Sequence, residues 1–305
     1  MSTTTSTTIA PTSPAVAASG TGAAGVLASA RAELLRLRKW PAVWVTIGAW
    51  MSLTALFGYL FNYLSVRTGD TSFSNDGATT DFLLSEILPA NAPHVLIQGM
   101  PMFGGALMLV LGAIVAGNGY GWGSWKTVFT QAPSRPSVAL GSMAALTVFV
   151  VGIVVASLAL CFGLSLLVAA TESQAVVWPA AAETAKSLGA GFLVVEMWAL
   201  IGYLLGTLAR GPALSVGLGL VWALVVENLL RGVGELLGPV EAFTKILPGT
   251  GGGSLVGSIV GTGGPDDTPG VLDVLSGGQA TVVVLAYLVL TPLLAGWLIT
   301  RRDVA

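Results

Sequence analysis

Six long apolar segments limit what this chain can fold into more than any other feature of its sequence. They lie near residues 41–64, 98–117, 138–170, 188–209, 212–230 and 281–300. An α-helix needs about 20 residues to cross the hydrocarbon core of a bilayer, and every segment approaches or exceeds that length. The third segment is the longest, so a helix formed by it must tilt or project beyond the membrane. The sequence therefore predicts an all-α integral membrane protein whose six transmembrane helices fall within residues 41–305.

The composition supports this prediction and excludes several kinds of site. Hydrophobic residues make up 54% of the chain and charged residues only 9%, whereas soluble domains carry about 25% charged residues. A net charge of −2 argues against nucleic acid as a partner. The chain has one cysteine, Cys161, and one histidine, His94. An intramolecular disulfide and metal sites that need two of either residue are therefore excluded, and we expect no metal site in this chain.

Two segments precede the first apolar one. Residues 1–24 are rich in Ser, Thr, Ala, Pro and Gly and lack Lys and Arg, which favours a disordered tail over a secretory signal peptide. Residues 25–40 place apolar residues at helical spacing among basic ones and end in Trp40. An amphipathic helix of this kind is typical of a membrane surface, where membrane lipids are its partners. The alternative is a helix docked on a partner protein.

The basic residues beside the apolar segments indicate how the chain crosses the membrane. With a cytoplasmic N-terminus, nine lie on the inner side: Arg31, Arg36, Arg38, Lys39, Lys126, Arg135, Arg210, Arg301 and Arg302. Four then lie on the outer side: Arg67, Lys186, Arg231 and Lys245. Because Lys and Arg favour the cytoplasmic side, we predict a plasma-membrane protein with both termini in the cytoplasm. Residues 118–137 then form a cytoplasmic segment, and residues 65–97 and 231–280 are external.

The external segments carry few signals of chemistry. Residues 249–253 are glycine-rich but lack the lysine of a phosphate-binding loop, so we interpret them as a flexible turn. Residues 254–262 are moderately apolar and too short to span a bilayer. They either dip into the outer leaflet and return, covered by protein, or form an exposed loop. His94 follows a proline in the other external segment, where we expect a loop position without a special role.

The cytoplasmic segment alternates aromatic residues with glycines, which is unusual for a simple connector. Its aromatic residues are Tyr120, Trp122, Trp125 and Phe129. A short helix near 122–131 would present them, with Lys126, to a protein partner, because aromatic residues are enriched at docking sites. The alternative is an aromatic belt at the membrane–water interface, which also collects Trp and Tyr. No Gly-Lys pair occurs in the chain. It therefore lacks the phosphate-binding motif of an ATPase, and we expect that it is not itself an enzyme.

In this segment the chain resembles the membrane subunits of bacterial ABC exporters of the type-2 permease class. The matching residues are Trp122-Gly123-Ser124-Trp125-Lys126-Thr127-Val128-Phe129, followed by Pro133-Ser134-Arg135. The resemblance extends to the basic entry at Arg31–Trp40, the six-span order, the long loop before the last span and the ending Arg301-Arg302-Asp303. The family often carries a Glu at the start of the cytoplasmic segment, where this chain has Asn118 or a neighbouring glycine.

The resemblance implies a function, a set of partners and one group of site residues. The chain would be a homodimeric permease that exports a drug, antibiotic or lipid with energy from two copies of a separate ABC ATPase subunit, and so would confer antibiotic resistance where the substrate is an antibiotic. ATP and Mg would bind to the partner, and this chain would bind no cofactor. Contact with the ATPase would fall to Tyr120, Trp122, Trp125, Lys126, Thr127, Phe129 and Arg135.

Two acidic residues lie within apolar segments, where a charge is costly and marks a functional candidate. Glu196 is one, and with Trp198 and Tyr203 it is a candidate for a substrate cavity; the alternative for Glu196 is a polar contact between packed helices. Glu227 is the other, and Arg231 follows one helical turn later. We interpret that pair as a structural ion pair.

Two other functions remain compatible with the sequence. A proton-coupled transporter or channel would use Glu196 and would need no partner. A membrane immunity or sensor subunit would transport nothing and would stimulate no ATPase activity.

Overall fold

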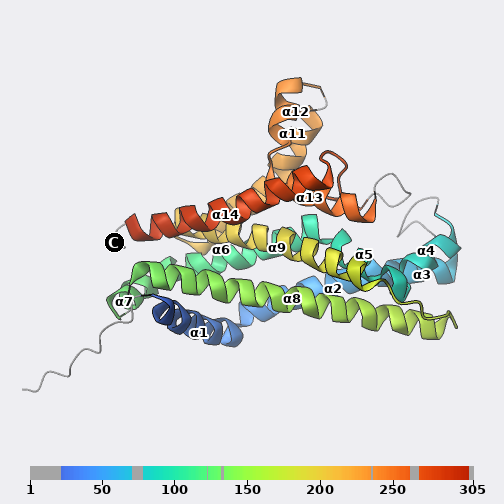
Figure 1. Cartoon of the computed structure of the whole chain (residues 1–305), viewed down its shortest axis with the longest axis horizontal. Coiled ribbons are helices and arrows are strands. Elements are labelled where there is room, and N and C mark those ends of the chain that lie inside the picture. Colours follow the sequence, from blue (N-terminus) through green and yellow to red (C-terminus); the bar gives the residue numbers. More distant parts are fainter. Residues whose placement is uncertain are drawn as a thin grey trace, which may run out of the picture.

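The computed structural model describes residues 22–70, 78–121, 123–131, 134–234, 236–261 and 268–301. In this part of the chain every regular element is a helix (Figure 1). Six helices are long and apolar enough to cross a membrane: Pro41–Thr68, Met100–Gly121, Arg135–Thr171, Ala181–Ala209, Pro212–Gly234 and Gly277–Arg301. Each overlaps one of the predicted apolar segments. The predicted all-α architecture with six candidate transmembrane helices is thus confirmed for the described residues.

Three of the spans are single helices, and three contain a π-helical turn. The single helices are α8 (Arg135–Thr171), α9 (Ala181–Ala209) and α14 (Gly277–Arg301). The first span consists of α2 (Pro41–Ala55), η1 (Leu56–Leu60) and α3 (Phe61–Thr68), the second of η3 (Met100–Gly104) and α6 (Gly105–Gly121), and the fifth of α10 (Pro212–Leu220), η4 (Val221–Val226) and α11 (Glu227–Gly234). Turns of this type occur frequently at functional sites.

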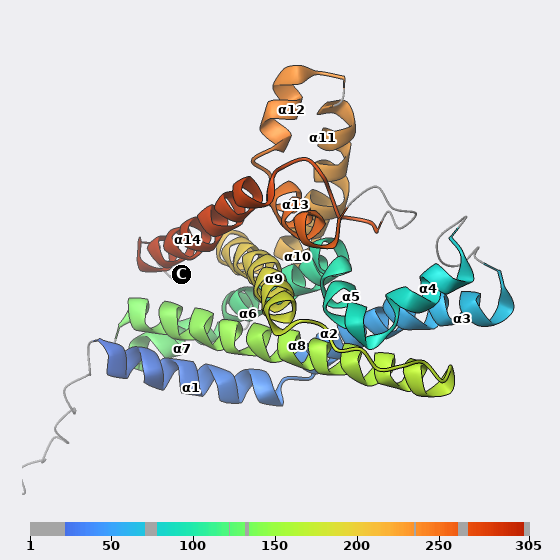
Figure 2. The same ribbon diagram turned by 45° about the vertical axis from the view of Figure 1, so that its right-hand side comes forward.

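Seven short elements connect or precede the spans. They are α1 (Ala23–Lys39), α4 (Thr80–Glu86), the 3-10 turn η2 (Pro89–Asn91), α5 (Ala92–Gln98), α7 (Ser124–Gln131), α12 (Gly238–Thr244) and α13 (Pro248–Val260). In both views α11 and α12 extend away from the other helices (Figures 1 and 2). The chain therefore leaves the bundle through α11 and α12 and returns to it before the last span, α14.

Helices α6 and α9 form the closely packed centre of the bundle, and glycines make their approach possible. A Cβ on Gly112 would collide with the carbonyl oxygen of Ala199, and one on Gly202 would collide with that of Leu109. Each glycine thus lies against the backbone of the other helix. Small residues allow such contacts between membrane helices, where van der Waals packing drives association.

Helix α1 runs along the first part of α8 in both views (Figures 1 and 2). The absence of a side chain at Gly141 of α8 allows this close approach, because a Cβ there would lie 2.8 Å from the backbone nitrogen of Ala30. With 37 residues, α8 is about 55 Å long and exceeds the hydrocarbon core of a bilayer, about 30 Å thick. Helix α1 begins at Ala23, two residues before the predicted start, because alanines favour the helix. Residues 1–21 of the predicted tail lie outside the described part, and the membrane-surface position of α1 stays a prediction.

The glycine-rich stretch at 249–253 is helical, so its interpretation as a flexible turn was wrong. These residues belong to α13, and Gly251, Gly252 and Gly253 are buried. A Cβ on Gly253 would collide with the carbonyl oxygen of Gly270, so glycine serves close packing here. Residues 254–257 are buried in the same helix, which excludes the exposed-loop interpretation for them.

His94 also lies in a helix, α5, where the sequence had suggested a loop. Pro93 precedes it in the first helical turn, a position that proline favours. His94 Nε2 lies 3.1 Å from Glu183 Oε1 in the first turn of α9. The residue thus connects α5 to the start of the fourth span.

Candidate functional site

Helix α7 is attached to the end of α6 through one buried side chain. Trp125 is 6% exposed, and its Nε1 donates a hydrogen bond of 3.2 Å to the carbonyl oxygen of Ala116. A Cβ on Gly119 would collide with the indole ring, so a glycine at this position makes room for the tryptophan. A left-handed turn at Gly123, with φ of 64°, reverses the chain between the two helices.

An aromatic cluster surrounds Trp125. The ring of Phe129 stacks on it with centroids 5.0 Å apart, and Tyr120 lies 5.9 Å from it on the other helix. The guanidinium carbon of Arg135 lies 5.6 Å from the Phe129 ring centre. Four of the residues predicted to contact an ATPase therefore hold α7 in place within this chain.

The outer face of α7 consists of different residues. Thr127 is exposed, and so is Val128, at 39%. Trp122 and the side chain of Lys126 lie outside the described part of the chain. The sequence prediction did not include Val128. Helical spacing could have indicated only Thr127 as outward, because it lies two residues after the buried Trp125 and so on the opposite side of the helix.

Helix α1 contacts the same end of α6. Arg36 Nη2 donates a hydrogen bond of 3.1 Å to the carbonyl oxygen of Val115, the residue before the one that Trp125 contacts. Arg36 also forms an ion pair with Glu33. Burial raises the pKa of Glu33, although the charge of Arg36 opposes that shift. Helices α1 and α7 are thus joined to adjacent carbonyl groups of one span.

Glu196 is buried between α9 and α8, at 4% exposure. Thr147 Oγ1 lies 2.6 Å from Glu196 Oε1 and 3.1 Å from the carbonyl oxygen of Met143. A hydroxyl group has one hydrogen to donate. An ionised Glu196 would share that hydrogen with the carbonyl oxygen of Met143, whereas a protonated Glu196 can donate to Thr147 and leave the hydroxyl hydrogen for Met143. Among the described residues, Glu196 Oε2 has no hydrogen-bond partner.

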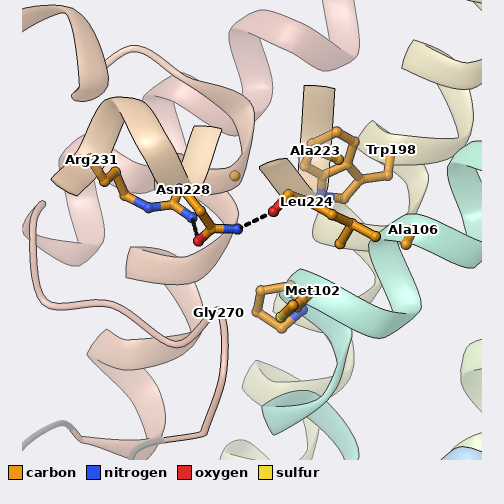
Figure 3. Close-up of a pocket in the computed structure, with 10 residues that line it drawn as sticks. Met102, Ala106, Trp198, Ala223, Leu224, Asn228, Arg231 and Gly270 are labelled. Carbon is orange, nitrogen blue, oxygen red and sulfur yellow. Dashed lines mark hydrogen bonds between the residues drawn. The ribbon is translucent and has the colours of Figure 1, made fainter. Parts of the chain in front are cut away.

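The three residues suggested for a substrate cavity lie in separate places. Glu196 contacts Thr147. Tyr203 is fully buried in α9, and its hydroxyl group has no partner among the described residues. Trp198 lines a pocket between the second, fourth and fifth spans (Figure 3). Of the three residues, Trp198 lines this pocket, and Glu196 and Tyr203 do not.

Glu227 joins the fifth span to α13. Trp222 Nε1 donates to Glu227 Oε1 at 3.0 Å, and the backbone nitrogen of Gly249 donates to Oε2 at 2.9 Å. Arg231 Nη1 lies 3.6 Å from Oε2 and donates at 3.4 Å to Thr250. The carboxylate therefore caps the start of α13, where the positive end of the helix dipole favours it. A Cβ on Gly249 would collide with Glu227, so this contact requires a glycine there.

The pocket beside Arg231 is small. Its lining consists of Pro101, Met102, Ala106, Trp198, Ala223, Leu224, Asn228, Arg231, Gly249 and Gly270. Its volume is about 20 Å³, whereas sites for drug-sized ligands enclose about 300–1,000 Å³. A single water-sized group fits. A whole amphipathic substrate would need further space.

Comparison with models of known protein families gives no match for this chain. Comparison with curated protein sequences also gives none.

Proposed function

We propose that this chain is the permease subunit of an ATP-driven exporter and that a separate ATPase supplies the energy. The observation that supports this most is the attachment of α7. A short helix between the second and third spans is held by Trp125 against α6, while Thr127 and Val128 face outward. A helix that is fixed on one side and exposed on the other is suited to transmit the movement of a bound partner.

The packing provides a route for that movement into the membrane part. A displacement of α7 acts on α6 through Trp125 and Ala116. Helix α6 in turn touches α9 through backbone contacts at Gly112 and Gly202, and such contacts leave little room for sliding. The α6–α9 pair would therefore move as one body when the ATPase closes on ATP and Mg.

The remaining features of the proposal come from charge and composition. The excess of Lys and Arg on one side supports cytoplasmic termini and a cytoplasmic α7 in the plasma membrane. A homodimer with two ATPase subunits agrees with the resemblance to type-2 permeases of ABC exporters. Exposed apolar side chains cover the spans, and charges within them are rare. A drug, antibiotic or lipid of amphipathic or apolar character is the substrate class that such surfaces favour.

Purification of the chain from its own cells in mild detergent tests this function. We expect an ATP-binding subunit in about equal amount by mass spectrometry, with vanadate-sensitive ATP hydrolysis. Recovery of the chain alone, without ATP hydrolysis, would contradict the proposal and favour a proton-linked mechanism at Glu196.

A pair of variants locates the contact. Val128→Asp places a charge on the exposed face of α7 and should abolish recovery of the ATPase. Val176→Asp is the matched control, because Val176 is exposed to a similar extent, 47%, in the connection between α8 and α9. Normal recovery with Val128→Asp would show that this face of α7 is not the docking surface.

A further inference from the structure

A buried donor without a partner borders the pocket between the second, fourth and fifth spans. Trp198 is 2% exposed, and its indole Nε1 has no hydrogen-bond partner among the described residues. The Cδ1–Nε1 edge of the ring faces α6 at Gly105, where a Cβ would collide with it. The next residue, Ala106, lines the pocket. Buried donors are nearly always paired, so the indole N–H needs an acceptor that the described residues do not supply.

The opposite wall of the pocket carries two further side chains with N–H groups, Asn228 and Arg231 (Figure 3). Asn228 Nδ2 donates to the carbonyl oxygen of Leu224 at 2.8 Å, and Asn228 Oδ1 accepts from Arg231 Nη2 at 2.7 Å. The amide oxygen is thus engaged, while one amide hydrogen remains available. Arg231 has five N–H groups and uses Nη1 on Thr250. Side-chain N–H groups without a hydrogen-bond acceptor in the described part of the chain are thus found on both walls of the pocket, on Trp198 and on Asn228.

The charge at the pocket is balanced. None of its ten lining residues is acidic, and the carboxylate of Glu227 lies 3.6 Å from Arg231. The neighbouring ion pair therefore provides no net negative charge to attract a cation. The donors favour an acceptor, and the balanced charge favours one that is uncharged.

The shape of the pocket suits one end of a longer molecule. Its volume of about 20 Å³ holds a group about the size of one water molecule. Met102, Ala106, Ala223 and Leu224 line it and are each half-buried, so an apolar wall leads from the pocket to the surface of the bundle. An acceptor oxygen fits inside, and an alkyl chain attached to it would lie against that apolar wall.

We propose that this pocket is a binding subsite for the hydrogen-bond-accepting group of an uncharged amphiphile, such as an ester or amide carbonyl, with Trp198 as the donor. That the bound molecule is a transported substrate rests on the proposed function. The binding itself needs no ATPase and is tested without one.

The test compares three probes that differ only in their head group. They are the methyl ester of a medium-chain fatty acid, the alkane of equal length and the alkylammonium ion of equal length. Binding of each tritiated probe to the purified full-length chain in nanodiscs is measured by scintillation proximity. We expect the ester to bind about fivefold more tightly than the alkane, because one neutral hydrogen bond accounts for about that ratio. The ammonium ion should bind no more tightly than the alkane.

Two variants assign the preference to the pocket. Trp198→Phe removes the N–H group and should abolish the preference for the ester, whereas the exposed Trp297→Phe on α14 should preserve it. Ala106→Val fills the pocket without removing a donor and should abolish the preference too, so a folding defect in one variant does not decide the result.

Equal binding of ester and alkane to the natural chain would mean that the pocket holds only an ordered water, and this would overturn the proposal. An ester preference that survives both pocket variants would also overturn it. If the ester preference is found but purification from cells recovers no ATPase, the subsite stands and only the exporter function is contradicted.

Discussion

Thr147 Oγ1 lies 2.6 Å from Glu196 Oε1, a contact that joins α8 to α9 inside the bundle. The same hydroxyl group lies 3.1 Å from the carbonyl oxygen of Met143. Because one hydroxyl hydrogen serves one acceptor, the arrangement fits a neutral carboxyl group that donates to Thr147. A neutral acid also avoids the cost of a charge within the membrane. Glu196 thus makes a polar contact between packed helices, while its role in a substrate cavity stays a prediction.

Substitution of Glu196 by Gln should therefore change stability little. The amide nitrogen can donate to Thr147 as the carboxyl group does, so we expect a change within about 0.5 kcal/mol, whereas Thr147→Val should cost about 1 kcal/mol, as for other hydrogen bonds between membrane helices. The free energy of unfolding, measured by detergent titration in mixed micelles, tests both values. A loss for Glu196→Gln as large as that for Glu196→Ala would indicate an ionised carboxylate.

The glycine contacts between α6 and α9 predict a contrast between two substitutions. Gly112→Ala forces a methyl group against the backbone of Ala199 and should destabilise the protein by about 2 kcal/mol, as overpacking does. Gly152→Ala on α8 is the matched control, because a Cβ there meets nothing within 4 Å. Its effect should be neutral or stabilising by about 0.5 kcal/mol. Equal effects of the two in the same unfolding assay would contradict the close packing of α6 on α9.

The sequence predicted the spans well because the bilayer imposes both length and composition on them. It predicted less where contacts distant in sequence decide the structure. The run from Gly249 to Gly253 has the composition of a turn, but in the structure it is part of a helix that packs closely against Gly270. Trp125 was expected to face a partner, but Gly119 makes room for it against α6. Periodicity alone does not reveal a pairing of this kind across a reversal of the chain.

The burial of Glu33 predicts that acid strengthens the docking of α1. Its pKa in the folded protein is raised above the ordinary value of 4.5, so the docked state binds the proton more tightly than the undocked state. The stabilisation is complete below pH 4.5 and is lost as the pH rises through the raised pKa. Glu33→Gln should remove this dependence on pH.

Thiol labelling measures the docking of α1 directly. Two variants are made in a chain with Cys161→Ala: Ala30→Cys at a buried position of α1 and Ala32→Cys at an exposed position. The labelling rate of the first is divided by that of the second. The ratio corrects for the effect of pH on thiol reactivity. It should fall as the pH is lowered from 7 toward 5, and it should stay constant with Glu33→Gln. A ratio that rises on acidification would show that ionised Glu33 stabilises docking through Arg36.

The hydrogen bond from Trp125 to Ala116 predicts a defect in coupling that is separate from binding of the ATPase. Trp125→Phe keeps an aromatic ring beside Phe129 but removes the N–H donor. We expect the ATPase to remain bound and ATP hydrolysis to continue. The amount of a fluorescent amphiphile moved into inside-out vesicles per ATP should fall about two- to fivefold, as expected for the loss of one hydrogen bond. The exposed Trp297→Phe serves as control and should leave the ratio unchanged.

Since Val128→Asp should instead remove the ATPase altogether, the two variants separate attachment of α7 to α6 from attachment of α7 to its partner. If Trp125→Phe also loses the ATPase, the two attachments are not separate. If it keeps both the ATPase and a normal ratio, the route through Ala116 carries no movement.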